Sequence, residues 1–600
     1  MVARDPPGDL LSQRADLMPR WYNGTEKTAL ELWMRMLFSA LVDADFLDTE
    51  AFYSAEKAAD RERPYPSIAE LETQLAIYLG DVEATAPSTP VNLVRREVRR
   101  SCAAAAAMPP GIFNLTVPTG GGKTLAAVAF ALAHARQHGK RRVIVVIPFT
   151  SIIEQNAAVY RRVFGDGTVI EHHSALDPVR ESPQNRIASE NWDAPIIVTT
   201  TVQLFESLFA NRTSSCRKLH NLVDSVIVLD EAQSLPGKLL PPILDVMAEL
   251  VRRYGVSLVV STATQPAFGK SPRLRDGLDG VTEICPSEMR LFDRLKRVRV
   301  EWPANDRPTP YTQWADEIAA EPAVLAVVHL RNDARKLCGL VDERLCDNST
   351  VHLSALMTPA HRARVLAGIT ARRKRGEPVR VVSTQLVEAG VDLDFPLVLR
   401  AFGGFDSLAQ AAGRCNREGL LAEGVLRVLI AETNPPRGVP AIGRDVALSM
   451  WRELGGNVDL FAPELQRSYF ERLYEATSLT AGVEIQKMRE ELKFKSVAMG
   501  FSLIADGWSA PLCVPHDDDG ARRLRDLRNQ GPSRGRLRAL QRYTINVPKT
   551  ALEKWVKQGV VTRVHDIVAV LEGGVLAAYH DRFGLEPDKV GQIDPEELIG

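Results

Sequence analysis

FNLTVPTGGGKT, residues 113–124, predicts a strand, a glycine-rich turn and the first turn of a helix in immediate succession. Glycines let backbone N–H groups approach a phosphate closely, and the N-terminus of a helix adds a partial positive charge. Lys123 is expected to reach phosphate oxygens from an exposed loop, and the Thr124 hydroxyl to ligate Mg²⁺. Val117 replaces the first glycine of the usual GxxxxGK[ST] pattern, so a glycine turn that merely precedes Lys-Thr is the alternative. The predicted nucleotide-binding residues of this loop are Thr119, Gly120, Gly121, Gly122, Lys123 and Thr124.

A second signal is VIVLDEAQ, residues 226–233, an apolar run that ends in two adjacent carboxylates. Asp230 is expected to hold Mg²⁺, and Glu231 to act as a general base toward water. A hydrophobic run followed by Asp-Glu is a weak signal alone, because charged pairs often cap strands. Downstream of a phosphate loop, it indicates a nucleotide-hydrolysing site.

Two hydroxyl-bearing segments follow, STAT (261–264) and STQLVEAGVD (383–392), each at the end of an apolar run. By themselves such hydroxyls more often cap turns. In this order they predict residues that couple a nucleotide to a nucleic acid. The predicted contacts are Ser261, Thr262 and Thr264 for coupling, Ser383 and Thr384 for nucleic acid, and Gly390 and Asp392 for the ribose or neighbouring arginines.

The segment QAAGRCNR, residues 410–417, places a polar amide and two guanidinium groups at helical spacing. On a helix, Gln410, Arg414 and Arg417 would share one face. Arginines facing the phosphates would stabilise charge that develops in the transition state. An isolated segment of this kind would more often be a solvated arginine pair.

Short β-branched runs alternate with helical patterns around these motifs, which predicts parallel sheets covered on both faces. The predicted fold class is therefore α/β, with two such domains in tandem. The expected ranges are 1–60, a helical segment; 61–90, a linker; 91–285 and 286–450, the two α/β domains; and 451–600, a mixed accessory domain.

Composition excludes several classes of protein. The 600 residues include 74 Lys and Arg against 75 Asp and Glu, so a nucleic acid must be attracted by local basic patches rather than by net charge. The seven cysteines form no CxxC pair, which argues against a zinc ribbon or a secreted disulfide framework. Without an apolar run of membrane-spanning length, a cytoplasmic protein with no membrane partner is expected.

Taken together, PTGGGKT, DEAQ, STAT, STQLVEAGVDLD and QAAGRCNREG resemble the ordered motifs of a superfamily 2 helicase. The segments 146–156, 171–176, 327–337 and 542–548 are similar to those of the type I CRISPR-associated helicase–nucleases, effectors recruited by the Cascade surveillance complex. The resemblance implies two RecA-like domains, ATP and Mg²⁺ as cofactors, and 3′→5′ movement on single-stranded DNA in antiviral defence.

One departure from that family concerns its N-terminal HD nuclease domain, which needs histidines and aspartates around its metals. No histidine precedes residue 134, and LFSALVDADFLDTE (37–50) resembles only the last HD helix, with Asp45 as its remaining metal ligand. Residues 1–60 are thus expected to be a remnant without nuclease activity, and a separate HD nuclease is a candidate partner.

Two other functions share these signals: a general DNA-repair or RNA helicase of superfamily 2, and a non-catalytic ATP-dependent clamp. The arginines between 522 and 542 leave a further choice open. They could lie along a phosphate backbone or form a surface for Cascade.

Overall fold

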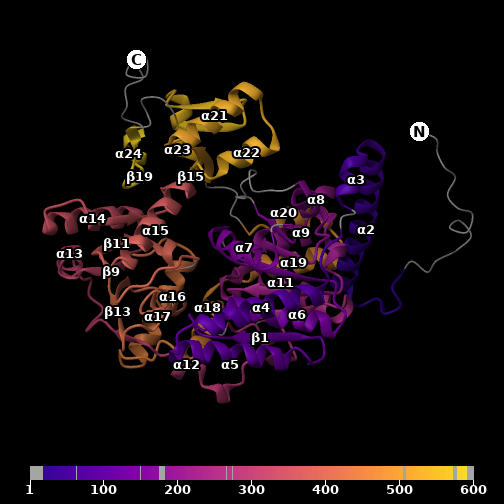
Figure 1. Cartoon of the computed structure of the whole chain (residues 1–600), viewed down its shortest axis with the longest axis horizontal. Helices are drawn as coiled ribbons and strands as arrows, with labels where there is room; N and C mark the ends of the chain where they lie inside the picture. The colour runs from indigo at the N-terminus through magenta and orange to yellow at the C-terminus, as the bar shows by residue number, and fades with distance from the viewer. Residues whose placement is uncertain are drawn as a thin grey trace, which may run out of the picture.

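The computed structural model describes residues 18–61, 64–148, 150–165, 167–173, 183–264, 266–272, 274–388, 390–503, 509–571 and 577–590. Two parallel α/β sheets lie side by side, and a smaller mixed module lies at the top of the view (Figure 1). The predicted fold class, two tandem α/β domains with a helical N-terminal region, is confirmed.

The first domain is built on a parallel sheet of order β3-β4-β2-β5-β6-β1-β7. Its central strands are apolar on both faces, and alternate residues pack into different cores; Ile144 contacts one core and Val145 the other. The strands are β1 Ile112–Thr116, β2 Arg142–Ile147, β3 Val169–His172, β4 Ile196–Thr200, β5 Ser225–Asp230, β6 Ser257–Thr262 and β7 Val281–Glu283.

Helices cover both faces of this sheet. One face is covered by α4 Ile68–Thr85, α5 Pro90–Ala105, α6 Lys123–Gln137 and α7 Thr150–Phe164. The other face is covered by α2 Lys27–Tyr53, α8 Pro183–Asn191, α9 Thr201–Leu208, α10 Thr213–Cys216 and α11 Leu240–Arg253, with α3 Ala55–Arg61 beside α2 and α8.

The second domain has a parallel sheet of order β10-β11-β9-β12-β13-β8. Its strands are β8 Val298–Glu301, β9 Ala323–Val327, β10 Val351–Leu353, β11 Val379–Ser383, β12 Leu397–Ala401 and β13 Gly424–Leu429. Its helices are α13 Tyr311–Ala320, α14 Arg331–Leu345, α15 Pro359–Lys374, α16 Phe405–Ala412 and α17 Val439–Glu453, and α12 Leu291–Arg294 lies in the connection between the domains.

The predicted linker over 61–90 is wrong. Most of it is α4, which begins at a capping box between Ser67 and Glu70 and buries Leu71, Leu75 and Leu79 against the first domain. Apolar residues every four positions bury one face of a helix in the core, which outweighs the polar composition of the segment.

The single accessory domain predicted for 451–600 is also wrong, because its first third packs on the two parallel-sheet domains. Three helices, α18 Pro463–Ala476, α19 Thr480–Glu490 and α20 Phe494–Gly500, cross from the second domain back to the first, where α19 packs on α2 and α11. Arg489 is fully buried there and forms ion pairs with Glu31 of α2 and Asp245 of α11. These contacts join the predicted N-terminal remnant to the core.

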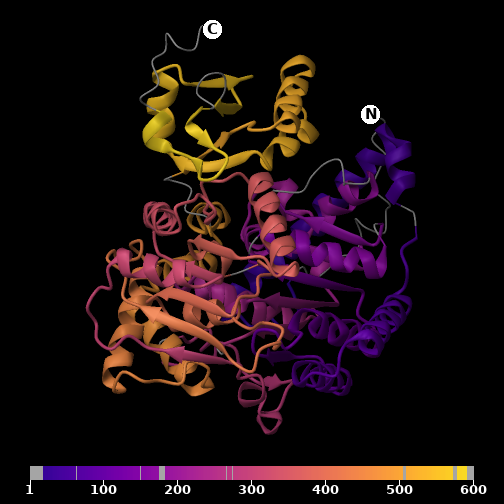
Figure 2. The same cartoon turned by 60° about the vertical axis from the view of Figure 1, so that its left-hand side comes forward.

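The remaining module contains a four-stranded sheet of order β15-β14-β17-β16 and lies over the second domain (Figure 2). It contacts that domain through the Tyr579 hydroxyl, which accepts a hydrogen bond of 2.9 Å from the Thr358 N–H. Its elements are β14 Ser509–Cys513, α21 Asp518–Gln530, α22 Arg534–Gln541, β15 Thr544–Pro548, α23 Lys549–Lys557, β16 Val561–Val564, β17 Val568–Leu571, β18 Tyr579–His580, β19 Gly584–Leu585 and α24 Pro587–Val590. Among the described residues, no helix is long and apolar enough to cross a membrane.

Candidate nucleotide site between the two domains

A cavity of about 670 Å³ lies between the two parallel-sheet domains, at the phosphate loop. Both domains line it with residues that the sequence motifs predict to bind the nucleotide, although these motifs lie far apart in the sequence. These are Thr119, Gly120, Gly122, Lys123, Thr124, Asp230 and Glu231 of the first domain and Gly390, Asp392, Arg414 and Arg417 of the second.

The loop itself follows β1 and leads directly into α6, which begins at Lys123. Gly120 and Gly122 adopt φ values of +84° and +81°, where only glycine is unstrained. Gly121 has a different role, since a Cβ there would lie 2.4 Å from Cγ1 of buried Val117. Val117 thus packs directly against the loop glycine, and Gly121 lies outside the residues that line the cavity.

Lys123 lies between two carboxylates at the end of β5. Its Nζ donates a 2.9 Å hydrogen bond to Oε1 of Glu231 and lies 3.8 Å from Oδ1 of Asp230. Burial opposes its charge, yet the attraction of both carboxylates raises the pKa of Lys123 above its ordinary value. Lys123 is 8% exposed, so the expected exposed lysine is wrong: the pairing draws it into the protein.

The same environment shifts the pKa values of Asp230 and Glu231 in opposite directions. Burial raises the pKa of Asp230, although Lys123 and a hydrogen bond of 3.0 Å from the Ser261 hydroxyl oppose this. For Glu231 burial is outweighed by Lys123 and by a hydrogen bond from Gln233, which lower its pKa. Glu231 is therefore held as a carboxylate, at a left-handed φ of +49° that is uncommon outside glycine.

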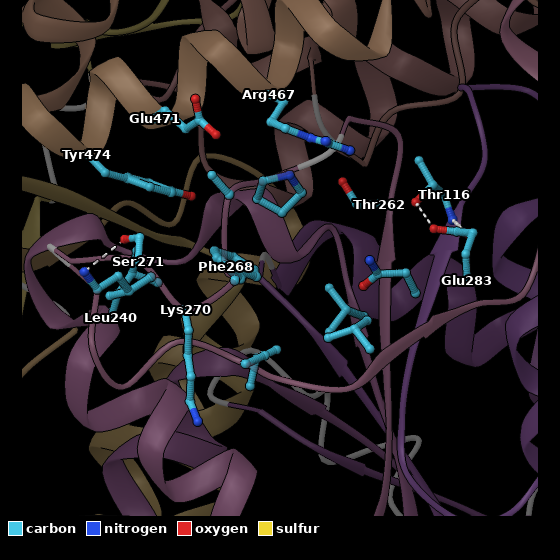
Figure 3. A pocket seen from close by; sticks show the side chains of 18 of the residues that line it. Thr116, Leu240, Thr262, Phe268, Lys270, Ser271, Glu283, Arg467, Glu471 and Tyr474 are labelled. Carbon is cyan, nitrogen blue, oxygen red and sulfur yellow. Dashed lines mark hydrogen bonds between the residues drawn. The ribbon is translucent and has the colours of Figure 1, made fainter. Parts of the chain in front are cut away.

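The STAT segment connects this site with a second cavity. Ser261 bonds Asp230, whereas Thr262 donates a 2.7 Å hydrogen bond to Oε1 of Gln233, and Gln233 bonds Glu231. Thr264 is buried, and its N–H bonds the Thr262 hydroxyl at 3.1 Å. Thr262 also lines a cavity of about 820 Å³ between the sheet edge and α18 (Figure 3). Of two consecutive residues of β6, Ser261 thus bonds a carboxylate that lines the nucleotide cavity, and Thr262 lines the second cavity.

The helix predicted through 410–417 is wrong. Helix α16 ends at Ala412, and residues 413–417 form a turn, here named the arginine turn. The Arg414 guanidinium donates to the carbonyls of Val387 (2.9 Å) and Glu388 (2.6 Å), which draws the chain out of the helix. Burial, together with neighbouring Arg417, lowers the pKa of Arg414 to about 10.

Arg417 and Asp392 face each other at the cavity, with Arg417 Nε 3.1 Å from Asp392 Oδ1. Three predicted residues of the second domain lie outside the cavity lining. Gln410 is half-buried on α16, Ser383 is buried at the end of β11 and donates to the Leu353 carbonyl at 3.1 Å, and Thr384 is buried beside it.

Asp45, the predicted nuclease ligand, is exposed on α2. Two residues earlier on this helix, Asp43 is buried, pairs with Arg217 at 2.8 Å and accepts a hydrogen bond of 3.0 Å from Asn191. Within the described ranges, no group of three or more His, Cys, Asp or Glu residues is placed to hold a metal ion. Asp43 therefore joins α2 to the first domain.

Sequence reasoning missed the basic wall that α5 contributes to the cavity. Arg95, Arg96 and Arg99 line it, as does Arg162 of α7. The signal was available: Thr89-Pro90 caps a strongly amphipathic helix, and the arginines follow at helical spacing. A short basic run of this kind is, by itself, more often a solvated helix face.

The arginines between 522 and 542 are partly neutralised. Arg522 and Arg523 both form ion pairs with Asp519. Partial burial tends to raise the pKa of Asp519, but hydrogen bonds from Arg523, Tyr543 and Arg522 outweigh burial and lower this pKa to about 2. Two of these arginines therefore already pair with a carboxylate of their own helix, α21.

Comparison with known proteins agrees with this geometry. Residues 101–270 match the family model of DEAD/DEAH box helicases, and residues 321–420 match that of CRISPR-associated nuclease/helicase Cas3, C-terminal. The CRISPR-associated nuclease/helicase Cas3 of Haloferax volcanii is 25% identical over 422 residues, 52% of this chain and 45% of its own length. The protein of the same description from Methanothermobacter thermautotrophicus is 25% identical over 324 residues, 50% of this chain and 38% of its own length. The chain thus spans less than half the length of these relatives.

Solved structures share the fold. The crystal structure of T. fusca Cas3 superposes with a TM-score of 0.58 at 18% identity, over 85% of this chain and 69% of that one. A chain of a CRISPR RNA-guided surveillance complex, pre-nicking, gives a TM-score of 0.51 at 17% identity, over 78% and 66%. The chain is a homologue of the Cas3 helicases, with a DEAD/DEAH box helicase domain followed by a second domain of the Cas3 type.

Proposed function

We propose that this chain is an ATP-dependent helicase that moves 3′→5′ on single-stranded DNA in type I CRISPR interference. The observation that carries the proposal is the meeting of the predicted ATPase residues of both domains at one cavity. A cavity shared by two domains can convert hydrolysis into relative movement, because the bound triphosphate draws the domains together and its products do not.

The cavity suits a nucleoside triphosphate and its Mg²⁺. Glycine N–H groups, the start of α6 and a basic wall converge on it, which is the charge pattern that a polyphosphate needs. The Thr124 hydroxyl and the Asp230 carboxylate both face it and supply the oxygen ligands that Mg²⁺ prefers. The ion would neutralise charge on the β- and γ-phosphates.

Hydrolysis then depends on an exchange of partners at Lys123. A triphosphate in the loop competes for the Lys123 ammonium, which the structure pairs with Glu231. Once Lys123 turns to the phosphates, the Glu231 carboxylate keeps its hydrogen bond from Gln233 but no longer that from Lys123. It can then accept a proton from the attacking water. Arg414 and Arg417 stabilise the charge that develops on the transferred phosphoryl group.

The direct test is ATP turnover by the purified 600-residue chain with and without single-stranded DNA, followed by unwinding of duplexes with a 3′ or a 5′ tail. We expect DNA-stimulated turnover and unwinding of the 3′-tailed substrate. Preference for RNA would favour a general superfamily 2 helicase instead. Nucleotide-dependent DNA binding without turnover would favour a clamp.

Two further parts of the proposal concern partners and the DNA product. Recruitment by Cascade is supported by the likeness to a chain of a CRISPR RNA-guided surveillance complex, and co-purification with Cascade subunits tests it. We also propose that these 600 residues do not cut DNA. Asp45 is exposed on α2, and the described residues contain no group of three or more His, Cys, Asp or Glu that could hold a metal ion. Nicking of single-stranded DNA with added Mn²⁺, Co²⁺ or Ni²⁺ that Asp45→Ala abolishes would refute this, whereas an HD nuclease supplied separately should restore cutting.

Gly413→Ala tests whether the two domains must meet closely. A Cβ at Gly413 would lie 2.8 Å from Oγ1 of Thr119 in the phosphate loop, while the backbone of Gly413 is helical and accepts alanine. We expect about a tenfold lower DNA-stimulated ATPase rate with an unchanged melting temperature, because small displacements of catalytic groups are costly. Gly368→Ala, whose added methyl meets nothing within 4 Å, is the matched control. Unchanged turnover in Gly413→Ala would mean that hydrolysis does not need this contact.

A further inference from the structure

Arg297 lies at the covalent junction between the two helicase domains and belongs to none of the motifs. It follows α12 and comes directly before β8, the edge strand of the second sheet. A residue at this position belongs to the second domain by sequence but can reach the first. Its side chain does so.

The Arg297 guanidinium donates hydrogen bonds to main-chain carbonyls on both sides of the domain boundary. Nη2 bonds the Thr119 carbonyl at 2.8 Å, and Nε bonds the Asn416 carbonyl at 2.8 Å. The remaining nitrogen, Nη1, bonds the Leu295 carbonyl at 3.1 Å. The first acceptor lies in the phosphate loop and the second in the arginine turn, so a single side chain connects the two halves of the nucleotide cavity.

On the loop side, this contact fixes a peptide that lines the cavity. The peptide between Thr119 and Gly120 is trans, so its N–H points away from the carbonyl that Arg297 holds. Arg297 thereby sets the direction in which the Gly120 N–H is offered to a phosphate. A Cβ at Gly120 would lie 2.4 Å from Nη2 of Arg297, so the glycine makes room for this guanidinium.

On the other side, the contact holds the residue before Arg417. Asn416 adopts a left-handed φ of +44°, and its own Nδ2 donates back to the Arg297 carbonyl at 3.2 Å. The next N–H, that of Arg417, bonds Oδ1 of Asp394 at 2.7 Å. The direction in which Arg417 leaves the turn is therefore set by groups that Arg297 helps to hold.

A second arginine repeats the pattern. Arg95 Nε donates to the Gly120 carbonyl at 2.8 Å, and its Nη2 lies 3.3 Å from Glu418, just beyond the arginine turn. Two consecutive loop carbonyls are thus held by arginines that also contact residues 416–418. Because Arg95 ends on an exposed carboxylate and Arg297 on a main-chain carbonyl, Arg297 provides the more defined geometry.

We propose that Arg297 is a positioning residue for the nucleotide reaction, a clamp that ties the phosphate loop to the arginine turn. It places the Gly120 N–H and the Arg417 guanidinium at the same phosphates. The proposal rests on the proposed ATPase function for its kinetic consequence, but the clamp itself is a property of the protein alone. It can therefore be measured in two independent ways.

The kinetic measurement compares Arg297→Met, which keeps the length of the side chain and removes its donors, with Arg297→Lys and Arg299→Met. Arg299 lies two residues further on, in β8, but is exposed and pairs with Glu301 and Glu423, so it is the matched control. We expect about a tenfold fall in kcat for Arg297→Met, a KM for ATP within about threefold of the wild type, and little change in Arg299→Met. Arg297→Lys should recover only part of kcat, because an ammonium cannot span two carbonyls in fixed directions.

A double-mutant cycle separates positioning from a general loss of structure. In the Arg417→Ala background, Arg297→Met should lower kcat by clearly less than about tenfold, because one of the two groups that Arg297 positions is already absent. The same tenfold fall in kcat in both backgrounds, or full recovery of kcat by Arg297→Lys, would refute the positioning role of Arg297.

The second measurement needs no nucleotide. Amide hydrogen exchange at residues 119–122 should become faster in Arg297→Met and stay unchanged in Arg299→Met. Unchanged exchange in Arg297→Met would overturn the clamp even if the protein proved inactive as an ATPase. Absent turnover in the wild type, with faster exchange in the variant, would instead refute the proposed function alone. If Arg297→Met melts early, Arg297→Gln, which keeps one donor group, takes its place in both measurements.

Discussion

Lys123→Ala is expected to lower DNA-stimulated ATP hydrolysis by about a thousandfold or more, since the ammonium both binds the phosphates and stabilises transition-state charge. Lys123 lies at the start of α6, where it contacts Glu231 at 2.9 Å and lines the nucleotide cavity. Steady-state phosphate release at saturating single-stranded DNA measures the effect. Lys140→Ala is the matched control, because Lys140 bonds the Gly255 carbonyl at 2.7 Å in the same domain, outside the cavity lining.

The same substitution should also lower stability. Removal of Lys123 leaves Asp230 and Glu231 close together and without their shared cation, and breaking such a buried pair costs about 3–5 kcal/mol. Without Lys123, the folded-state pKa of both carboxyl groups should rise. The deficit relative to the wild type should therefore shrink as the pH falls through those pKa values, because the protonated groups no longer repel. Lys123→Met, which keeps the volume, separates packing from charge. Wild-type turnover in either folded variant would exclude this site.

The sequence was sufficient for the elements whose signals are local. A strand, a glycine turn and a helix start are encoded within residues 113–124, and the structure forms all three. The end of β5 at Asp230 follows from an apolar run that stops at a charge. Because the carboxyl ends of parallel strands share one edge of a sheet, these two segments had to meet there.

Features that depend on tertiary contacts could not be predicted in this way. QAAGRCNR has helical spacing, but the carbonyls of Val387 and Glu388 bind Arg414 and end α16 at Ala412. The return of α19 to the first domain depends on the buried ion pairs of Arg489, whose partners lie more than two hundred residues away. Arg297 lacks any local signal, because its acceptors are main-chain carbonyls that any residue could supply.

Glu231→Gln is expected to retain nucleotide binding and lose turnover by about two to four orders of magnitude, the range that a positioned general base contributes. The amide keeps the shape of the side chain and can still accept a hydrogen bond from Lys123, but it cannot take a proton from water. Glu231 has a φ of +49°, and glutamine shares its Cβ and Cγ, so the backbone strain is the same in both proteins. Loss of the Glu231 charge also lowers the repulsion on Asp230, so that carboxylate stays ionised beside Lys123.

Fluorescent-nucleotide binding and phosphate release, measured on the same preparation, separate the two effects. Glu249→Gln is the matched control: Glu249 is a buried glutamate of the same domain that pairs with Arg252 and Arg253 on α11. It should affect the melting temperature and leave turnover intact. The Glu231→Gln protein should remain on single-stranded DNA with ATP bound, because the closed cleft forms but cannot reopen through hydrolysis. If nucleotide binding disappears together with turnover, Glu231 holds the site together rather than activating water, and the general-base role passes to another group.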